Sequence, residues 1–208
     1  TYGGTSWIPA PPNPGWAAPG DCCLSVSTRA LPSPEAWLAG PVRALRYGAT
    51  SNSGAYSYGA VVLNAVFPIP GTGTTWYGGS TMAVGGSLRL YRKTSSSTLT
   101  VIFFTGGVVR GICFANESEG WAVATGGNLV HITNGTAAQP TIKVSSAPTS
   151  SNLDSIFMID EKTGWIVGDR GTILRTTTGT SWATRSSGTV NRLRDVAFRD
   201  LDHGVIVG

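Results

Sequence analysis

Short apolar segments alternate with polar or glycine-containing turns in the second half of the chain. Residues 153–159 alternate apolar and polar side chains, and after a polar turn Gly164–Gly168 forms a short apolar run. The turn signal Asp169-Arg170-Gly171 precedes residues 172–177, and a further segment starts at Ser181. Segments of this length and alternation, separated by such turns, are typical of antiparallel strands. We therefore predict a meander of four short strands in this part of the chain.

The pattern recurs at intervals of about 40 residues, a repeat length found in propeller blades. Gly120-Trp121-Ala122-Val123-Ala124 aligns without a gap with Gly164-Trp165-Ile166-Val167-Gly168. Fainter copies are Met82-Ala83-Val84-Gly85 and Gly204-Val205-Ile206-Val207-Gly208, and the four segments end 39, 44 and 40 residues apart. We therefore predict an all-β fold, a β-propeller of four-stranded blades. Residues 1–208 would form a single domain of about five blades, either a small closed ring or part of a larger one.

Two regions depart from the repeat. Residues 8–41 hold eight of the chain's 12 prolines. Proline cannot donate to a sheet ladder, so we predict a proline-rich arm or an insertion within the propeller. The last repeat stops after its second strand, while Gly3-Gly4-Thr5-Ser6-Trp7 matches Gly179-Thr180-Ser181-Trp182. The N-terminus thus resembles the tail of a blade, which favours either a fragment or completion of the last blade by a strand from another chain.

Charge and hydropathy narrow the classes of partner. The net charge is +4, and no basic run is longer than Arg92-Lys93, so we expect no nucleic-acid binding. No apolar run approaches the roughly 20 residues of a membrane span. The chain opens without a charged and apolar leader, and Thr1 is not an initiator, so either a leader has been removed or the chain is part of a longer one.

The repeat resembles the BNR-like blades of the photosystem II assembly and stability factor propellers. The resemblance rests on Gly164-Trp165-Ile166-Val167-Gly168, Gly171-Thr172-Ile173 and Gly179-Thr180-Ser181-Trp182, and it covers about residues 82–208. Related Asp-box repeats occur in sialidases, glucan hydrolases and sorting receptors. The aspartate of the Asp-box should fall at Thr177, Thr133 and Tyr2, and none of these is acidic. The resemblance implies a photosystem-assembly-like role as one possibility and also implies a basic patch.

The acidic residues favour structural roles over catalysis. Their commonest position is the first turn of each blade, where short polar side chains cap turns; these residues are Glu117, Glu119, Asp160, Glu161, Asp200 and Asp202. Asp154, Asp169 and Asp195 lie near the opposite ends of strands and are the better catalytic candidates, although a structural role is favoured for them too. His131 and His203 fall on different blades, so we expect neither a metal site nor a cofactor.

The aromatic residues divide into two groups. Trp121 and Trp165 recur at one repeat position, which predicts packing between blades. The tryptophans outside that register, together with a neighbouring tyrosine, are candidates for an exposed surface that stacks on a glycan or a protein partner; they are Trp16, Trp37, Trp76 and Tyr77.

Two glycosylation sequons, at Asn116 and Asn134, fall in the first and third turns of one blade and therefore on one face. The opposite face would then be free for binding, through Arg170, Arg192 and Arg194. Cys22, Cys23 and Cys113 permit one disulfide; a bridge from Cys22 or Cys23 to Cys113 is favoured over one between adjacent cysteines, and three free thiols are the alternative.

Together these features predict a secreted or extracellular, glycosylated and non-catalytic propeller. It would act as a structural or protein-interaction module and could self-assemble into filaments by strand complementation. An organelle lumen is the alternative location. An Asp-box glycan-binding lectin or glycoside hydrolase, and a photosystem-assembly-like factor, are the alternative functions.

Overall fold

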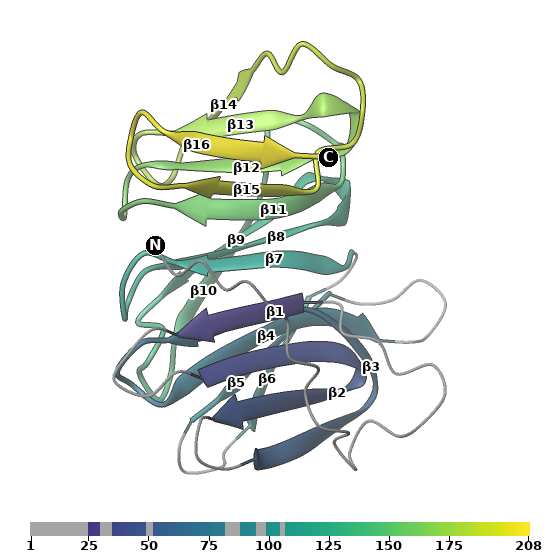
Figure 1. The fold of residues 1–208 in the computed structure, drawn as a ribbon, viewed down its shortest axis with the longest axis vertical. Coiled ribbons are helices and arrows are strands. Elements are labelled where there is room, and N and C mark those ends of the chain that lie inside the picture. Colours follow the sequence, from purple (N-terminus) through teal and green to yellow (C-terminus); the bar gives the residue numbers. More distant parts are fainter. Residues whose placement is uncertain (1–24, 30–34, 49–51, 82–87, 95–98, 105–106) are drawn as a thin grey trace, which may run out of the picture.

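The computed structural model describes residues 25–29, 35–48, 52–81, 88–94, 99–104 and 107–208. These residues form antiparallel sheets joined by turns, and the helical segments among them are single 3-10 turns (Figure 1). Among the described residues, no helix is long and apolar enough to cross a membrane.

The strands follow chain order within each sheet. The first sheet has six strands: β1 (Ser25–Arg29), β2 (Glu35–Gly48), β3 (Asn52–Ile69), β4 (Thr74–Thr81), β5 (Leu88–Lys93) and β6 (Leu99–Phe104). The second has four: β7 (Val109–Phe114), β8 (Gly120–Ala124), β9 (Asn128–Thr133) and β10 (Thr141–Ser146). The third also has four: β11 (Leu153–Met158), β12 (Gly164–Gly168), β13 (Ile173–Thr176) and β14 (Trp182–Arg185). The fourth contains β15 (Asp195–Phe198) and β16 (Gly204–Val207). The 3-10 turns η2 (Thr125–Gly127) and η3 (Asp169–Gly171) follow β8 and β12.

The second and third sheets are the four-stranded meanders that the repeat predicts. Each opens with a strand of mixed buried and partly buried residues, continues with a second strand that is buried throughout, and turns through a 3-10 segment into the third. A fully buried second strand requires small and apolar residues on both faces, which the Gly-Trp-Ala-Val-Ala and Gly-Trp-Ile-Val-Gly segments supply. The fold prediction is therefore confirmed for this part of the chain.

The first sheet differs from the predicted four-stranded blades. Residues 25–104 supply six strands of one sheet, and β3 runs for 18 residues. β1 and the start of β2 fall within the predicted proline-rich arm, and Pro41 pairs with Val62 of β3. The remaining residues of the predicted arm lie outside the described residues.

The faint repeat copy was aligned out of register in this sheet. Met82-Ala83-Val84-Gly85 lies outside the described residues, and β4 takes the place of the second strand because it pairs directly with β5. Trp76 on β4 lies opposite Arg92 of β5, just as Trp121 lies opposite His131 and Trp165 opposite Arg175. Trp76 therefore occupies the recurrent tryptophan position.

Successive sheets pack face to face, with β3 of the first sheet and the first strands of the other three sheets side by side. β7 contacts β3 on one side and β11 on the other, and β11 in turn contacts β15. The hydrophobic core is accordingly divided into clusters between neighbouring sheets. Trp121 belongs to the cluster between the second and third sheets, and Trp165 packs with Leu193 and Val196 at the fourth. The prediction that these tryptophans pack between blades is confirmed.

A hydrogen bond repeats at two of these contacts. The Trp76 indole N–H donates to the carbonyl of Gly135 at 3.1 Å, and the Trp121 indole N–H donates to the carbonyl of Gly179 at 2.9 Å. In both cases a tryptophan on one sheet reaches the third turn of the next sheet. Because a buried indole N–H needs an acceptor, this bond fixes the distance and the register between sheets.

Candidate functional site

A β-bulge recurs in β3, β7 and β11, which together with β15 are called the inner strands, and it places polar side chains around one cavity. The pairing register shifts between Leu63 and Ala65 in β3, between Val109 and Gly111 in β7, and between Leu153 and Ser155 in β11. A bulge leaves one residue out of the ladder and re-aims its side chain. The residues at the three shifts are Asn64, Arg110 and Asp154, and Arg194 holds the matching place just before β15.

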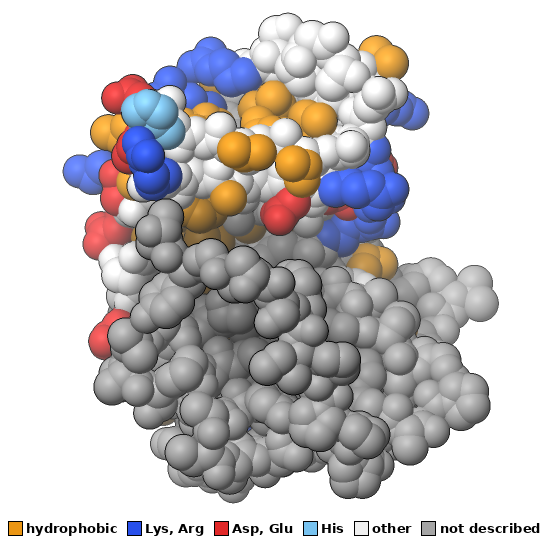
Figure 2. Space-filling view, viewed as in Figure 1, with side chains coloured by type: hydrophobic (Ala, Val, Ile, Leu, Met, Phe, Trp, Pro, Cys, Tyr) orange, Lys and Arg blue, Asp and Glu red, His pale blue; other side chains and the backbone are white. Residues whose placement is uncertain are grey.

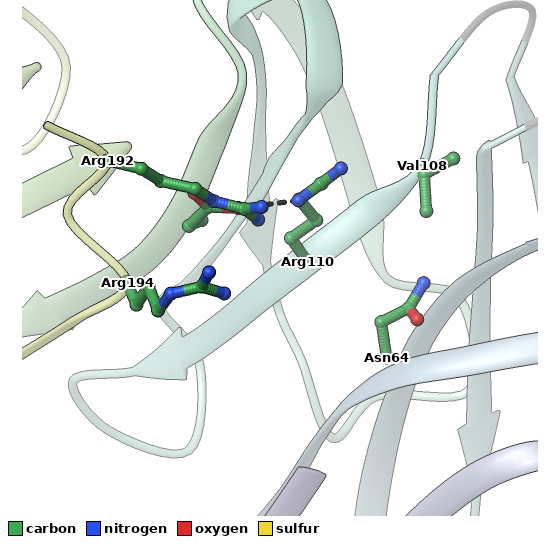
Figure 3. A pocket seen from close by; sticks show the side chains of 6 residues that line it. Asn64, Val108, Arg110, Arg192 and Arg194 are labelled. Atoms are coloured by element: carbon green, nitrogen blue, oxygen red, sulfur yellow. Dashed lines mark hydrogen bonds and ion pairs between the residues drawn. The ribbon is translucent and has the colours of Figure 1, made fainter. Parts of the chain in front are cut away.

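These four side chains meet at one end of the inner strands. A cavity of about 410 Å³ is lined by them together with Val108 and Arg192, which lies in the β14–β15 connection. Figure 3 shows Arg192 and Arg194 pointing toward Arg110, which projects from the neighbouring inner strand. We call Asn64, Arg110, Asp154, Arg192 and Arg194 the arginine mouth.

Asp154 holds two of the three arginines in place. Its Oδ1 accepts hydrogen bonds from Arg110 Nη1 at 2.7 Å and from Arg192 Nη2 at 2.6 Å, while its Oδ2 accepts from Arg192 Nε at 2.7 Å. The Asp154 side chain is 6% exposed, so these bonds form largely out of water. The pair with Arg192 is bidentate, which fixes its direction as well as its distance, while Arg110 is held by a single hydrogen bond. Both guanidinium groups therefore lie at the cavity wall.

Residues of the third sheet also hold Arg192 in place. Arg192 Nε also lies 3.1 Å from Asp169 Oδ1, and Asp169 Oδ2 accepts a hydrogen bond from Asn152 at 2.8 Å. The hydrogen bond to Asp154 raises the pKa of Arg192, and the charges of Asp154 and Asp169 act in the same direction. Arg192 therefore remains cationic at any pH at which the protein is folded.

Arg194 differs from the other two arginines. Its backbone N–H donates to the Val207 carbonyl at 2.7 Å, which fixes its place beside β16. Its guanidinium forms no hydrogen bond or ion pair with the described residues, and the side chain is exposed. Arg194 therefore presents a cation none of whose side-chain hydrogen-bond donors is used by the described residues, so all of them are available to a ligand.

Sequence reasoning identified part of this site. Arg192 and Arg194 were predicted to lie on a free face, and the structure brings them together. Arg170 is exposed in η3 with a positive φ of 57° and does not line the cavity. Arg110 and Asn64 were missed. A signal was available, because each bulge residue follows a buried apolar residue (Leu63, Val109, Leu153, Leu193) at spacings of 46, 44 and 40 residues.

The aromatic candidates do not form an exposed surface where the structure describes them. Trp76 and Tyr77 are 0% and 1% exposed, so the expectation that they are surface residues is wrong. The reason is the register described above, which places Trp76 between two sheets. Trp37 lies on β2 opposite Ser27, and its side chain is outside the described part of the chain, as is the whole of Trp16.

Asp160 and Asp200 cap the first turns of their blades, as predicted. Asp160 Oδ1 accepts from the backbone N–H groups of Lys162 and Thr163, and these bonds lower the pKa of Asp160. Asp200 Oδ1 accepts from the backbone of Asp202 and His203; a hydrogen bond with the His203 ring contributes most to lowering its pKa. These carboxylates therefore stabilise the turns in which they lie.

The two sequons lie on neighbouring turns. The backbone N–H groups of Asn134 and Gly135 donate to the side chain and the carbonyl of Ser118, which joins the first and third turns of the second sheet. Both asparagines are exposed. Asn116 also caps its turn through Oδ1, and its Nδ2 donates to Glu161 at 2.6 Å. Their attachment to glycan stays a prediction.

Cys113 is a buried free thiol, so the predicted bridge from Cys22 or Cys23 to Cys113 is wrong. Cys113 lies on β7, facing the third sheet, where its sulfur accepts a hydrogen bond from the Met158 backbone. Burial raises the pKa of this thiol to about 11. Cys22 and Cys23 lie outside the described residues.

Comparisons with known proteins support the architecture. No family model matches the chain, and no curated protein matches it. A solved structure described as YCF48 bound to D1 peptide is similar with a TM-score of 0.67 at 18% identity. The match covers 99% of this chain and 67% of that one. At this identity the likeness concerns the fold alone, and it agrees with the sheet order described above: the chain has the fold of a β-propeller built from four-stranded blades.

Proposed function

We propose that this β-propeller is a non-catalytic protein-interaction module that binds an acidic segment of its partner at the arginine mouth. The observation that carries the proposal is the convergence of Arg110, Arg192 and Arg194 on one cavity. Guanidinium groups bind carboxylates with charge-assisted hydrogen bonds and fixed geometry, and arginine is enriched at protein interfaces.

The surroundings of the mouth suit a peptide better than a small metabolite. A second cavity of about 460 Å³ shares Asn64, Arg110, Asp154 and Arg194 with the first and continues along the inner strands to Phe67 and Ile156. Both cavities are open to solvent and have polar rims. A bound segment could therefore place an acidic group among the arginines and extend an apolar side chain along the strands.

The structural likeness supports the same class of ligand. The similar propeller is described as bound to a peptide, and a photosystem-assembly-like role for this chain is one specific form of the proposal. It would require that the acidic segment belong to a photosystem subunit.

Binding of a labelled acidic peptide tests the proposal. We expect a fluorescein-labelled peptide of glycine, serine and aspartate to bind the full chain, with an affinity that falls as salt is added. Arg194→Gln should weaken binding by about tenfold or more, because a hydrogen bond to a charged group contributes about 1.5–3 kcal/mol. Arg199→Gln is the matched control, since Arg199 lies 77% exposed at the β15–β16 turn and pairs with Asp200. Equal affinity of all three proteins would contradict the proposal.

Self-association through the fourth sheet is a second candidate function. Within the described residues β16 pairs only with β15, and Val205 and Val207 on β16 are 64% and 53% exposed. Figure 2 shows apolar side chains gathered on the part of the described surface where β16 lies. An edge strand with exposed apolar residues favours addition of a further strand, and a second copy could supply it.

Sedimentation analysis of the chain and its Val205→Lys variant tests self-association. Lysine on an edge strand opposes strand addition, so the variant should remain monomeric at concentrations at which the parent protein forms larger species. A parent protein that stays monomeric at high concentration would contradict this candidate.

Export and glycosylation also belong to the proposal. Exposure of Asn116 and Asn134 on joined turns supports a glycosylated face opposite the arginine mouth. Asn134 is the better acceptor, because the amide of Asn116 is engaged with Glu161. Mass spectrometry of the protein secreted from eukaryotic cells should find glycan at Asn134; an unmodified Asn134 would contradict this assignment.

A further inference from the structure

Asp154 places a buried carboxylate inside a basic binding site. Within the described residues, the polar contacts of its side chain go to Arg110 and Arg192, and 6% of the side chain is exposed. A buried carboxylate is tolerated when such partners surround it, so structural pairing is one role of Asp154. Its position at the cavity wall gives it a second effect, on the charge of the ligand that can enter.

The charges around the cavity nearly balance without Arg194. Arg110 and Arg192 are both paired with Asp154, and Arg192 also lies 3.1 Å from Asp169. Two guanidinium groups therefore face two carboxylates. Arg194 adds a cation with no partner among the described side chains, so the first cavity retains an excess of one positive charge; Asp195 lines only the second cavity.

An excess of one positive charge suits one class of anion. A carboxylate carries one negative charge and can be bound by the guanidinium of Arg194. A phosphoryl group carries a charge of about −1.5 to −2 and three acceptor oxygens, and it is best bound by several free guanidinium groups. Here Nη1 of Arg110 and both Nε and Nη2 of Arg192 are already directed at Asp154. The negative charge of Asp154 also opposes a dianion in the same cavity.

We propose that Asp154 is a specificity-determining residue, which limits the arginine mouth to a single carboxylate and excludes phosphoryl groups. This inference rests on the proposed function, because it names the kind of acidic group that the same site accepts. It predicts that the partner is recognised through an aspartate, a glutamate or a terminal carboxylate, and that phosphorylation of the partner segment does not replace that group.

The isosteric variant Asp154→Asn separates charge from shape. The amide retains the size of the carboxylate and an oxygen that can accept from Arg110 or Arg192. It removes the negative charge, so Arg110 and Arg192 become available to a ligand. We expect the variant to bind the phosphoryl ligand more tightly, because Arg110 and Arg192 can then form charge-assisted hydrogen bonds with it. The ratio of phosphoserine to aspartate affinity should rise by about tenfold or more.

The experiment compares two labelled peptides on three full-length proteins. The peptides share a glycine and serine sequence with an amidated C-terminus, which removes the terminal carboxylate. They differ at one central position, which is aspartate in one and phosphoserine in the other. The proteins are the parent chain, Asp154→Asn and the control Asp202→Asn, whose carboxylate lies exposed in the β15–β16 turn. Anisotropy titrations at one salt concentration give the affinity ratio for each protein.

We expect the parent chain and Asp202→Asn to prefer the aspartate peptide and Asp154→Asn to shift toward phosphoserine. A parent chain that prefers phosphoserine would overturn the inference even if Asp154→Asn failed to fold. An unchanged ratio in folded Asp154→Asn would also overturn it while leaving the proposed function intact. Failure of the parent chain and of folded Asp154→Asn to bind either peptide would overturn both proposals.

Discussion

Single side chains fix how neighbouring blades meet. Trp76 and Trp121 each close the gap to the next sheet with one indole hydrogen bond, whereas Trp165 stacks on Phe198 with ring centroids 3.7 Å apart. The Trp165 indole N–H forms no hydrogen bond with any described residue. The three tryptophans thus share a position, and Trp76 and Trp121 form an indole hydrogen bond that Trp165 does not form with the described residues.

Trp121→Phe should therefore destabilise the protein more than Trp165→Phe. Both variants lose the same atoms, but only the first leaves the Gly179 carbonyl without its donor. We expect the free energy of unfolding from urea titrations to fall by about 1 kcal/mol more for Trp121→Phe. Equal losses would show that the hydrogen bond between blades contributes nothing measurable.

Cys113 should be chemically inert in the folded protein. The pKa of its buried thiol is raised to about 11, and the thiolate is the reactive species. In a Cys22→Ser, Cys23→Ser variant, Ellman's reagent at pH 8 should label Cys113 only after denaturant is added. Rapid labelling of the native protein would contradict its burial.

Acid should weaken the first turns. The backbone N–H groups of Lys162 and Thr163 lower the pKa of Asp160 below its ordinary value of 3.8. A carboxylate whose pKa is lower in the folded state stabilises the fold above its unfolded pKa, and this stability is lost as the pH falls through the folded pKa. Asp160→Asn can keep the turn without titrating. Its Tm should therefore fall less between pH 5 and pH 2 than that of the parent chain; parallel curves would argue against this role.

At the scale of elements, the turns between strands decide where blades touch. Gly171 ends η3 with a φ of +65°, and a Cβ there would meet the backbone carbonyl of Thr189. Gly188 has a similar φ of +70° but open space around it. Comparing substitutions at the two glycines therefore distinguishes the cost of backbone strain from the cost of a steric clash.

Gly171→Ala should cost more stability than Gly188→Ala. Both variants pay for a positive φ, about 1–2 kcal/mol for a residue with a side chain. Only Gly171→Ala must also move the β14–β15 connection, which carries Arg192. Thermal unfolding should show the larger loss for Gly171→Ala, and it should also weaken binding of the acidic peptide. A greater loss for Gly188→Ala would contradict the packing described here.

How far the sequence predicts these elements depends on local signals. Gly164–Gly168 and its copy at Gly120–Ala124 were placed correctly, because glycine, tryptophan and turn residues recur there without gaps. The first sheet was not, because glycine, serine and proline are scattered through its long strands and do not mark their ends. The tryptophan of its repeat also precedes the apparent copy at Met82. The sequence predicted only part of the arginine mouth, because a bulge is determined by the pairing between strands. In the sequence it is marked only by a polar residue that follows an apolar one.

At the scale of the whole molecule, stacking of the sheets turns a local bulge into a binding site. No single blade contains the arginine mouth: Asn64, Arg110 and Asp154 come from three successive sheets, and Arg194 comes from the start of the fourth. The site therefore exists only when the sheets are packed in order. It follows that binding of an acidic ligand should raise the Tm of the whole chain.

A crystal structure of the full chain with the aspartate peptide is the most direct test of the central claim. The account predicts that the peptide carboxylate lies within hydrogen-bond distance of the Arg194 guanidinium, between β7 and β15, with Asp154 still bound to Arg110 and Arg192. A peptide bound along the edge of β16 or on the face of Asn116 and Asn134, with the arginine mouth empty, would contradict it.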